Sequence, residues 1–599
     1  MAARILSHVG LSVAIVALTA AGVTLAYFSE GYTPFVLALV ALTAVVGVGL
    51  NILLGLAGQV SLGHVGFYAI GAYTAAILTL KGVDFWIAFP LAGLVAGAVG
   101  AVLALPALRV TGPYLAMVTI AFAFIVQHGL IEWKALTGGQ NGLMGLQPPA
   151  LGGQAFSERE MAMLAVVLAG LSLYLSHRIA QSAWGKGMLA VRDSETAARS
   201  VGLNPVVIKT VAFTLSAVFT GLAGAIFAPL LMFVAPDSFP FSQSILFLLA
   251  VIVGGTGWVL GPAVGAVISV VLPELLAGLA EYRLLFFGAL LLVVLWLAPT
   301  GVIGTLARLL PRGHQRSAEG GGFDITGFLA PPGATAPLEV SNVSLSFGGI
   351  RAASDVSFAA APGAITSVIG PNGAGKTTVL NVIGGFYRPD AGSVRLAEVE
   401  LAGAPAWRVA RAGIARTYQT TKLFESMSVV DNLLIALRRG RLGGLLSAAD
   451  SHADRRAAEA LLVFVGYRGP VDVTAGELPH VDRRLVEIAR ALAARPRVLL
   501  LDEPAAGLMR SEKAALAALM RRVADLGIAV ILVEHDMAVV MGISDHVVVL
   551  DAGACIAAGA PAAVRYDAKV LRAYLGGTEM RPRPRRAPWD GARPPVLTA

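Results

Sequence analysis

The sequence predicts a polytopic, all-α membrane domain of about ten helices, followed by an α/β domain with a phosphate-binding loop. The first observation behind this prediction is the distribution of charge. The 599-residue chain averages 14% charged residues, but residues 1–311 hold 22 of them, roughly 7%, and residues 312–599 hold 60, roughly 21%. The second observation is a GxxxxGK[ST] motif in the charged half, at residues 370–377. The first half is therefore expected to lie in a lipid bilayer.

Ten apolar runs of about 17–25 residues predict the membrane helices. They lie near residues 11–28, 34–54, 62–80, 85–105, 114–131, 161–176, 210–234, 244–259, 261–278 and 283–298. The first run could imitate a signal peptide, but it is close to spanning length and many further spans follow. We therefore interpret it as a retained membrane helix.

Charge in the loops predicts the orientation of these helices. Residues 178–209 carry five Lys and Arg against two acidic residues, which favours a cytoplasmic position for this segment. Six spans precede it, so the N-terminus and Arg109 are also expected to be cytoplasmic. The longest external loop is then residues 132–160. A cytoplasmic C-terminal half requires four later spans, which splits residues 244–278 at Gly254–Gly261.

One polar segment interrupts the apolar sequence, and small residues recur elsewhere at close-packing distance. The polar segment contains Gly58, Gln59, Ser61, Gly63 and His64. Polar groups at membrane depth are costly unless they face protein or water. Two interpretations are open: a broken helix that lines a translocation route, and hydrogen bonding between helices. The spacing of Gly93 with Gly97, and of Gly261 with Gly265, favours close helix packing.

Several motifs in this half resemble the permease subunits of branched-chain amino-acid ABC importers. They are GLAGQVSLGH at residues 55–64, GAY at 71–73, LTGGQNG at 136–142 and AGA at 223–225. The resemblance covers about residues 35–300 and implies a type II ABC importer-like membrane fold. It also implies that AVRDSETAA at residues 190–198 docks an ATPase, with Arg192, Asp193 and Glu195 as its charged residues. The alternative for that segment is an ordinary charged connector.

The composition also predicts domain boundaries. The permease domain is expected at residues 1–311, a flexible Gly-, Pro-, Ala- and Ser-rich linker at 312–337, and the ATP-binding domain at 338–577. Residues 578–599 form a Pro- and Arg-rich tail, which we expect to face lipid in the cytoplasm and not to bind nucleic acid. The single cysteine, Cys555, excludes an internal disulfide and a four-cysteine zinc site.

The glycine-rich motif follows an apolar run at residues 364–369 that predicts a buried strand. Its backbone N–H groups would wrap phosphates, Lys376 would neutralise the β- and γ-phosphates, and the Thr377 hydroxyl would bind Mg²⁺. The residues expected to bind ATP are Gly370, Pro371, Asn372, Gly373, Ala374, Gly375, Lys376, Thr377 and Thr378.

A second strand pattern, Val498–Leu501, ends in Asp502 and Glu503. Asp502 is expected to support Mg²⁺, and Glu503 to activate the attacking water. His535 follows another apolar run, 33 residues after Asp502, from where it could reach the γ-phosphate. These positions predict an ATP-hydrolysing site.

The order of these motifs resembles ABC-transporter ATPases, over about residues 338–577, and in particular the first ATPase of the same branched-chain system. The resemblance implies ATP and Mg²⁺ as cofactors. It implies that Gln419, in IARTYQ at residues 414–419, senses nucleotide, helps to bind Mg²⁺ and contacts the permease. It implies that Phe347 stacks on adenine, with a core aromatic as the alternative. Permease and ATPase are usually separate chains in that family, so this chain is predicted to be a fusion.

One segment departs from the family. Where the family has Leu-Ser-Gly-Gly-Gln or a near variant, this chain has Leu478, Pro479, His480, Val481 and Asp482. Proline removes an N–H, valine is stiff where glycine permits close approach, and the aspartate repels phosphate unless a neighbour such as Arg483 neutralises it. We therefore expect a heterodimer with a second ATPase that has an intact signature, in which one of two ATP sites hydrolyses.

Together these features predict one subunit of an ATP-driven importer in a bacterial inner (plasma) membrane, with a cytoplasmic ATPase. The resemblance implies a second permease, a second ATPase and an external solute-binding protein as partners. The substrate is expected to be branched-chain amino acids or a related small polar solute. The alternative is a nucleotide-binding sensor or structural subunit with weak hydrolysis. An exporter is less favoured, because residues 178–209 are too short for long cytoplasmic helical extensions.

Overall fold

The computed structural model describes residues 2–108, 110, 112–275, 282–309, 317, 322–330, 336–448 and 451–575. Arg109, most of the predicted linker and the arginine-rich tail lie outside these residues. The chain divides into two compact units, Met1–Leu329 with Pro405–Pro496, and Ala330–Ala404 with Arg497–Ala599. The first unit therefore combines the membrane half with part of the charged half.

Each of the ten apolar runs forms a helix in the first unit. The helices are α1 (Ala2–Phe28), α2 (Thr33–Asn51), α3 (His64–Leu80), α4 (Phe85–Ala107), α5 (Pro113–Glu132), α7 (Glu158–Gln181), α10 (Pro205–Leu231), α11 (Phe241–Gly254), α12 (Gly261–Leu275) and α13 (Arg283–Leu297). In the described part of the chain, seven helices are long and apolar enough to cross a membrane, and α3 and α12 are shorter apolar helices. The predicted polytopic helical domain is confirmed.

Small residues let these helices approach closely. Helix α10 packs along α3 and α4, and α12 packs against α2 and α11. A Cβ atom added at Gly93 would lie 2.7 Å from the Leu222 side chain of α10, and one at Gly97 would lie 2.6 Å from Val218. Gly265 similarly lies against the backbone of α11. The packing interpretation of the paired glycines is confirmed.

The polar segment of the sequence lies at a break between two helices. After α2 the chain forms a π-helical turn, η1 (Ile52–Leu56), and helix α3 begins only at His64. The break is held by neighbouring helices: His64 Nε2 lies 2.6 Å from Ser216 Oγ, and the Leu62 N–H donates to Thr119 at 3.0 Å. The broken helix and the hydrogen bonds between helices are thus both present. A translocation route along this segment stays a prediction.

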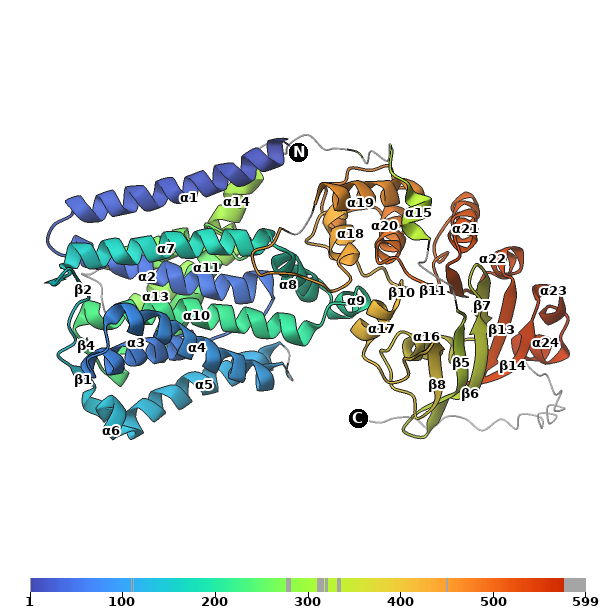
Figure 1. Ribbon diagram of the computed structural model, residues 1–599, viewed down its shortest axis with the longest axis horizontal. Helices are drawn as coiled ribbons and strands as arrows, with labels where there is room; N and C mark the ends of the chain where they lie inside the picture. The colour runs from blue at the N-terminus through green and yellow to red at the C-terminus, as the bar shows by residue number, and fades with distance from the viewer. Residues whose placement is uncertain are drawn as a thin grey trace, which may run out of the picture. The chain divides into compact units, whose positions relative to one another are not determined.

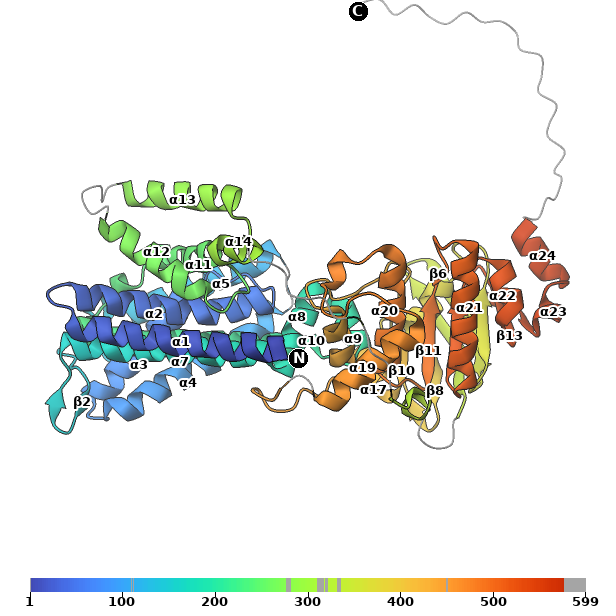
Figure 2. The ribbon, with the colours of Figure 1, turned by 90° about the horizontal axis from the view of Figure 1, so that it is seen from above.

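The two ends of the bundle carry different short elements (Figures 1 and 2). At one end lie α8 (Ala183–Asp193) and α9 (Glu195–Ser200). The other end carries α6 (Lys134–Thr137) and the paired strands β1 (Leu143–Met144) with β4 (Phe233–Val234), and β2 (Ala150–Leu151) with β3 (Gln154–Ala155). Residues 178–209 and 132–160 therefore lie at opposite ends of the bundle, as expected for a cytoplasmic and an external loop.

The first unit also contains a helical subdomain from the charged half. It consists of α17 (Ala406–Ala412), β10 (Ile414–Arg416), α18 (Val429–Leu437), α19 (His452–Val465) and α20 (His480–Ala493). Helix α14 (Gly301–Leu309) ends the membrane half, and α15 (Ile325–Leu329), within the predicted linker, packs against α19. The Phe328 carbonyl accepts a hydrogen bond from Arg495 Nε at 3.0 Å.

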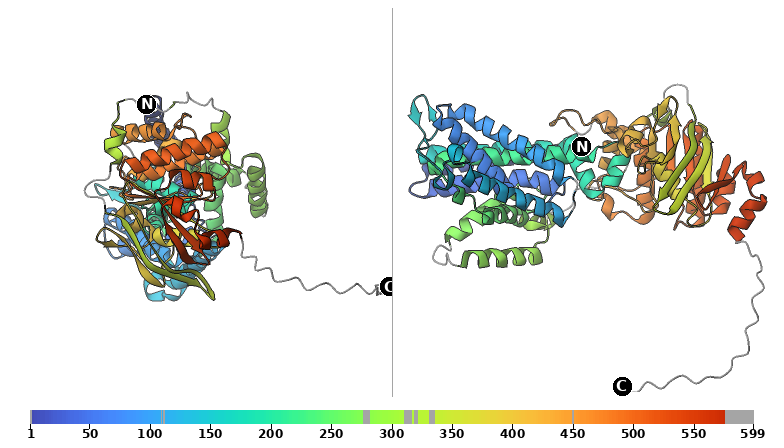
Figure 3. Two further views of the ribbon diagram at one scale, coloured as in Figure 1. Left: turned by 90° about the vertical axis from the view of Figure 1, so that its right-hand side faces the viewer. Right: turned by 90° about the horizontal axis from the view of Figure 1, so that it is seen from below.

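The second unit is built around a twisted sheet (Figure 3). Its strands are β5 (Leu338–Phe347), β6 (Ile350–Ala360), β7 (Ile365–Ile369), β8 (Ala391–Leu396), β9 (Val399–Glu400), β11 (Val498–Asp502), β12 (Ala529–Val533), β13 (His546–Asp551) and β14 (Ala554–Gly559). Its helices are α16 (Lys376–Ile383), α21 (Arg510–Asp525), α22 (Met537–Ile543), α23 (Pro561–Val564) and α24 (Ala568–Leu575). Within this unit the strands run in the order β11-β12-β7-β13-β14-β6-β5-β8-β9. This arrangement confirms the predicted α/β domain.

Candidate functional site

Three loops of the second unit meet at one edge of its sheet. Strands β11, β12 and β7 are adjacent and parallel. Because the carboxyl ends of parallel strands lie at the same edge, the segments that follow them come together there. The glycine-rich loop follows β7, Glu503 follows β11, and His535 lies just beyond β12. Residues more than 160 positions apart in the sequence thus form one cluster.

The glycine-rich loop has the backbone conformation of an anion-binding loop. Gly373 has φ 83° and Gly375 has φ 95°, values that favour glycine. Gly375 is also the residue that precedes α16, so the free N–H groups of that helix start within the motif. A Cβ atom at Gly373 would meet nothing within 4 Å, so the loop opens into free space. Asn372 and Thr377 are exposed beside it, and Ala374 is buried beneath it.

Lys376 is held in the mouth of this loop. Its ammonium group donates hydrogen bonds to the carbonyls of Gly370 at 2.8 Å and Pro371 at 2.9 Å. Burial lowers the pKa of Lys376, and the negative charges of Glu503 and Asp502 oppose this by raising it. The side chain is 6% exposed. A cation held among two carboxylates and the free N–H groups of the loop is positioned to receive phosphate oxygens.

The acidic residues at the end of β11 and directly after it complete the cluster. Asp502 is buried at the end of the strand. Glu503 Oε1 lies 2.8 Å from His535 Nε2, and the Glu503 N–H donates to the Val533 carbonyl at 2.9 Å. Glu503 has φ 47°, an uncommon conformation for a residue other than glycine. The backbone and His535 therefore both fix the direction of the carboxylate.

Glu534 is part of this cluster, although no motif in the sequence points to it. Its carboxylate accepts hydrogen bonds from the N–H of Ala505 at 2.6 Å and from that of His535 at 3.2 Å. Burial raises the pKa of Glu534, and these two N–H donors act in the opposite direction. Glu534 thus ties the loop after Glu503 to the backbone of His535. The signal available in the sequence was an acidic residue at the end of the apolar run Ile528–Val533.

Phe347 lies at the end of β5 and is 48% exposed. Its ring makes an edge-to-face contact with Tyr387, with 5.3 Å between the ring centroids. Because so much of the ring is open to solvent, Phe347 is not a core aromatic. The structure therefore offers two exposed aromatic rings in this part of the second unit, where the sequence predicted one.

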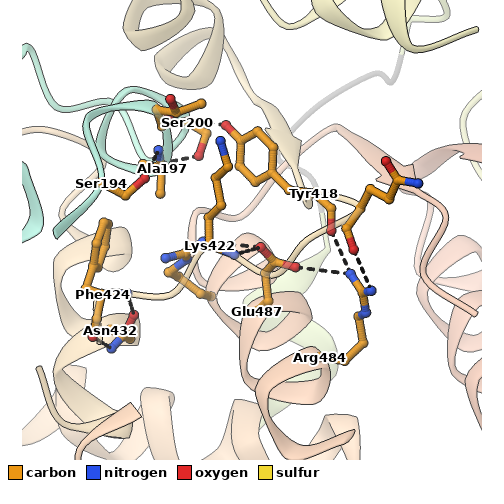
Figure 4. A network of polar contacts seen from close by, with 12 residues as sticks. Ser194, Ala197, Ser200, Tyr418, Lys422, Phe424, Asn432, Arg484 and Glu487 are labelled. Atoms are coloured by element: carbon orange, nitrogen blue, oxygen red, sulfur yellow. Dashed lines mark hydrogen bonds and ion pairs between the residues drawn. The ribbon is translucent and has the colours of Figure 1, made fainter. Parts of the chain in front are cut away.

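Gln419 and the signature segment belong to the first unit. The main-chain carbonyls of Tyr418 and Gln419 accept hydrogen bonds from Arg484, at 2.6 Å and 2.9 Å (Figure 4). Glu487, fully buried below them, accepts the N–H of Lys422 at 2.9 Å, and burial raises its pKa. The segment that carries Gln419 is therefore held by side chains of α20.

The altered signature lies at the beginning of α20. Pro479 precedes the helix and provides no side-chain hydrogen bond to its first turn, and Asp482 lies within that turn. Burial raises the pKa of Asp482. The guanidinium of Arg483 donates to the carbonyls of Leu478 at 2.9 Å and Gly476 at 2.5 Å, and lies 3.3 Å from Glu425. Arg483, which could have neutralised Asp482, thus makes its polar contacts elsewhere.

The charged residues of the predicted docking segment make separate contacts within the first unit. Asp193 Oδ2 accepts both the backbone N–H and the hydroxyl of Ser426, each at 2.7 Å. Glu195 forms an ion pair with Lys209, which lies in the first turns of α10. The guanidinium of Arg192 contacts Asp193 at 3.3 Å and also donates to the carbonyl of Gly55.

Further contacts in and directly before this segment were not predicted from the sequence. Lys186 Nζ lies 2.6 Å from Asp431 Oδ2, and the indole N–H of Trp184 donates to the Gly443 carbonyl at 3.0 Å. The hydroxyl of Tyr418 donates to the Thr196 carbonyl at 3.2 Å. In the sequence, Lys186 is only one of several positive charges in residues 178–209, and no local pattern identifies its partner Asp431. The membrane half and the helical subdomain are thus joined by several polar contacts.

Two known families match the chain. The branched-chain amino acid transport system / permease component family matches residues 32–295, and the ABC transporter family matches residues 353–506. The two matches fall in the two halves that composition separates. They agree with the resemblances drawn from the motifs.

Individual relatives match the same halves. The chain is 42% identical over 248 residues to the high-affinity branched-chain amino acid transport ATP-binding protein BraF of Pseudomonas aeruginosa, covering 40% of this chain and 97% of that protein. It is 38% identical over 284 residues to the permease protein LivM of the corresponding Escherichia coli system, covering 43% of this chain and 67% of that protein. A crystal structure of a nucleotide-free ATP-binding cassette from an ABC transporter is 30% identical, with a TM-score of 0.36, covering 40% of this chain and 98% of that one.

Proposed function

This chain belongs to the branched-chain amino-acid transport family of ABC transporters, and because it joins a permease domain to an ATP-binding domain, we propose that it couples ATP hydrolysis to amino-acid uptake. One observation carries the proposal. The membrane helices and the helical subdomain of the ATP-binding half form one compact unit, joined by the bonds between Asp193 and Ser426. Movement of the ATPase can therefore reach the membrane helices through direct contacts.

We propose roles for the residues at the sheet edge. Lys376 neutralises the β- and γ-phosphates, and the N–H groups of residues 370–378 bind phosphate oxygens. Glu503 accepts a proton from the attacking water, and His535 holds its carboxylate while reaching toward the γ-phosphate. Gln419 reports the nucleotide to the docking segment, because the hydroxyl of its neighbour Tyr418 contacts Thr196. Phe347 supplies a face for adenine, and Tyr387 supports its ring.

The residues fit a magnesium ion. Mg²⁺ prefers oxygen ligands, and it is commonly bound by one or two carboxylates together with substrate phosphates and water. Thr377 and Asp502 provide a hydroxyl and a carboxylate, and the negative charge of Asp502 already acts on Lys376 beside the loop. We assign Gln419 as a further ligand by resemblance. When bound, the ion would neutralise phosphate charge in the transition state.

The altered signature leads to an unequal pair of ATP sites. In this family each ATP site joins the phosphate loop of one ATPase to the signature of another. This chain has a complete phosphate loop but a signature with Pro479, Val481 and an Asp482 that Arg483 does not contact. We therefore propose a heterodimer with an ATPase that has an intact signature. The site built on Lys376 hydrolyses ATP, and the other mainly binds it.

The remaining partners follow from the same family. We propose a second permease subunit, a separate external binding protein that delivers the solute, and a bacterial inner membrane with the ATPase on the cytoplasmic side. The solute is a branched-chain amino acid or a related small polar molecule. The positive charge of residues 178–209 supports this orientation.

Uptake by the purified complex tests the proposal. The complex, with its companion chains, is reconstituted into vesicles with ATP on the ATPase side and radiolabelled leucine, isoleucine or valine with binding protein on the other. We expect accumulation that requires ATP and is lost in Glu503→Gln. ATP-dependent uptake that survives unchanged in Glu503→Gln contradicts the proposal and favours a nucleotide sensor. Arg456→Ala, a change at an exposed residue of α19, is the control.

A further inference from the structure

A side chain of the docking segment reaches the break in the membrane helix. Arg192 lies in the last turn of α8, and its guanidinium donates a hydrogen bond to the carbonyl of Gly55. Gly55 lies in η1, the π-helical turn between α2 and the break. Carbonyls at such a turn have fewer backbone partners than those of a regular helix, and π-turns occur frequently at functional sites. The contact therefore joins α8 to the irregular turn that follows the membrane helix α2.

The backbone at Gly58, which follows this turn, leaves space for the same arginine. Gly58 has φ 69°, and a Cβ atom there would lie 2.5 Å from Cγ of Arg192. Glycine is thus required twice, for the left-handed conformation and for the space that the arginine stem occupies. The stem of Arg192 passes closely by the break, and its charged end is bonded to the turn that precedes it.

A separate side chain, that of Asn51 at the end of α2, connects the start of the turn to the membrane bundle. The Asn51 side chain accepts the N–H of Gly257 at 2.7 Å and donates to the Trp258 carbonyl at 3.0 Å. These residues lie between α11 and α12. The turn is therefore attached to the membrane bundle, through Asn51 and through its packing against α10, and to the docking segment, through Arg192.

The next residue in the chain, Asp193, contacts the helical subdomain of the ATP-binding half. Asp193 contacts Arg192 at 3.3 Å and accepts two hydrogen bonds from Ser426 in the helical subdomain. A continuous path thus runs from Ser426 through Asp193 and Arg192 to Gly55. Two cations on either side of this segment bind elsewhere: Lys186 pairs with Asp431, and Arg199 pairs with Glu195 at 3.4 Å.

We propose that Arg192 is a positioning residue that couples the helical subdomain to the helix break at Gly55–Gly58. When the subdomain shifts, Asp193 and Arg192 move with it, and Arg192 displaces the π-helical turn against the anchor at Asn51. The polar segment after the turn, residues 58–64, then changes position with the state of the ATPase. This inference rests on the proposed transport function and adds the residue that carries movement into the membrane domain.

Variants of Arg192 in the full reconstituted complex test the inference. Arg192→Ala is expected to lower uptake per ATP hydrolysed at least tenfold while ATP hydrolysis stays within about twofold. Arg192→Lys keeps the charge but cannot contact Gly55 and Asp193 with one planar group, and is expected to be intermediate. Arg199→Ala is the matched control, because that arginine lies in α9, directly after the segment, and is exposed.

Hydrogen exchange gives a readout that a loss of folding would not mimic. In a Glu503→Gln background, ATP is expected to change the exchange of residues 52–63 and of 183–200. With Arg192→Ala added, residues 183–200 still respond to ATP and residues 52–63 do not. Continued response of residues 52–63, or unchanged uptake per ATP in Arg192→Ala, overturns the inference. A wild-type complex without ATP-dependent uptake contradicts the transport function itself, so the two failures are distinguishable.

Gly58→Ala provides an independent perturbation of the same contact. Its methyl group pushes on the arginine stem, so uptake per ATP is expected to fall in this variant too. Combining it with Arg192→Ala removes that steric conflict, and the double variant is expected to be no worse than Gly58→Ala alone. Unchanged uptake per ATP in Gly58→Ala would contradict the inference.

Discussion

The imidazole of His535 and the carboxylate of Glu503 form a hydrogen-bonded pair, with 2.8 Å between Nε2 and Oε1. The two residues come from the ends of neighbouring parallel strands. Glu503 is 16% exposed at its side chain and His535 is 42% exposed, so the histidine forms the open side of the pair. A water molecule approaching the phosphate loop would meet a carboxylate whose direction is already fixed.

We expect the two residues of this pair to differ in their contribution to hydrolysis. Glu503→Gln removes the proton acceptor and is expected to lower ATP hydrolysis by the complex about 100-fold or more, because general bases contribute 10²–10⁴-fold. ATP binding should remain, since Lys376 and the glycine-rich loop are untouched. Steady-state hydrolysis and binding of a fluorescent nucleotide measure the two properties. Loss of nucleotide binding in Glu503→Gln would contradict this assignment.

Restoring the signature is expected to activate the second ATP site. The triple variant Pro479→Ser, Val481→Gly and Asp482→Gln returns a hydroxyl, a flexible backbone and a neutral side chain to the start of α20. Hydrolysis by the heteromeric complex should rise about twofold, as expected when a second site of equal rate joins the first. The turnover of the complex under saturating ATP measures this change.

A single variant separates the two sites. Lys376→Ala disables the site on this chain's own phosphate loop, so the native complex should lose most of its hydrolysis. In the background with the restored signature, about half should remain, because the partner's phosphate loop still works with the repaired signature. Most of the activity surviving Lys376→Ala in the native complex would contradict the asymmetric arrangement.

The sequence was sufficient for the architecture and for the residues at the sheet edge. Apolar runs separated by turns predict membrane helices well, because lipid leaves only helices and closed barrels as spanning structures. The phosphate loop follows β7, Asp502 ends β11 and His535 lies just beyond β12, so parallel strands bring them to one edge. The local sequence is therefore enough to predict almost all of this part of the site.

The contacts of the docking segment could not be predicted in the same way. Arg192 and Asp193 are neighbours in the chain, yet one contacts Gly55 and the other Ser426, which is 233 positions away. Which direction each side chain takes depends on packing around α8 and not on a local pattern. The π-helical turn could not be predicted either. One extra residue in a helical turn leaves the run of apolar residues unchanged, so the hydrophobic periodicity does not reveal the turn.

The two hydrogen bonds between Asp193 and Ser426 are expected to contribute to uptake together, as a single docking contact. Asp193→Asn weakens both charge-assisted hydrogen bonds, which are worth about 1.5–3 kcal/mol each when one partner is charged. Ser426→Ala removes only the hydroxyl. The double variant Asp193→Asn with Ser426→Ala should lose little more uptake per ATP than Asp193→Asn alone, because both changes affect the same contact. Independent, multiplying losses in this double-mutant cycle would contradict a shared docking contact.

In the segment between the two halves of the chain, Arg495 lies over the Phe328 ring at 4.9 Å and donates a hydrogen bond to the Phe328 carbonyl. Leu329 beside it is buried, so residues 325–329 are attached to the helical subdomain. A cation–π contact with a partly exposed ring contributes about 0.5–1 kcal/mol. Arg495→Ala should therefore release this segment and increase its rate of limited proteolysis about fivefold, with uptake changed by less than twofold. Arg456→Ala, on the exposed side of α19, should leave the cleavage rate unchanged, and equal rates in both variants would show that Phe328 is held by other contacts.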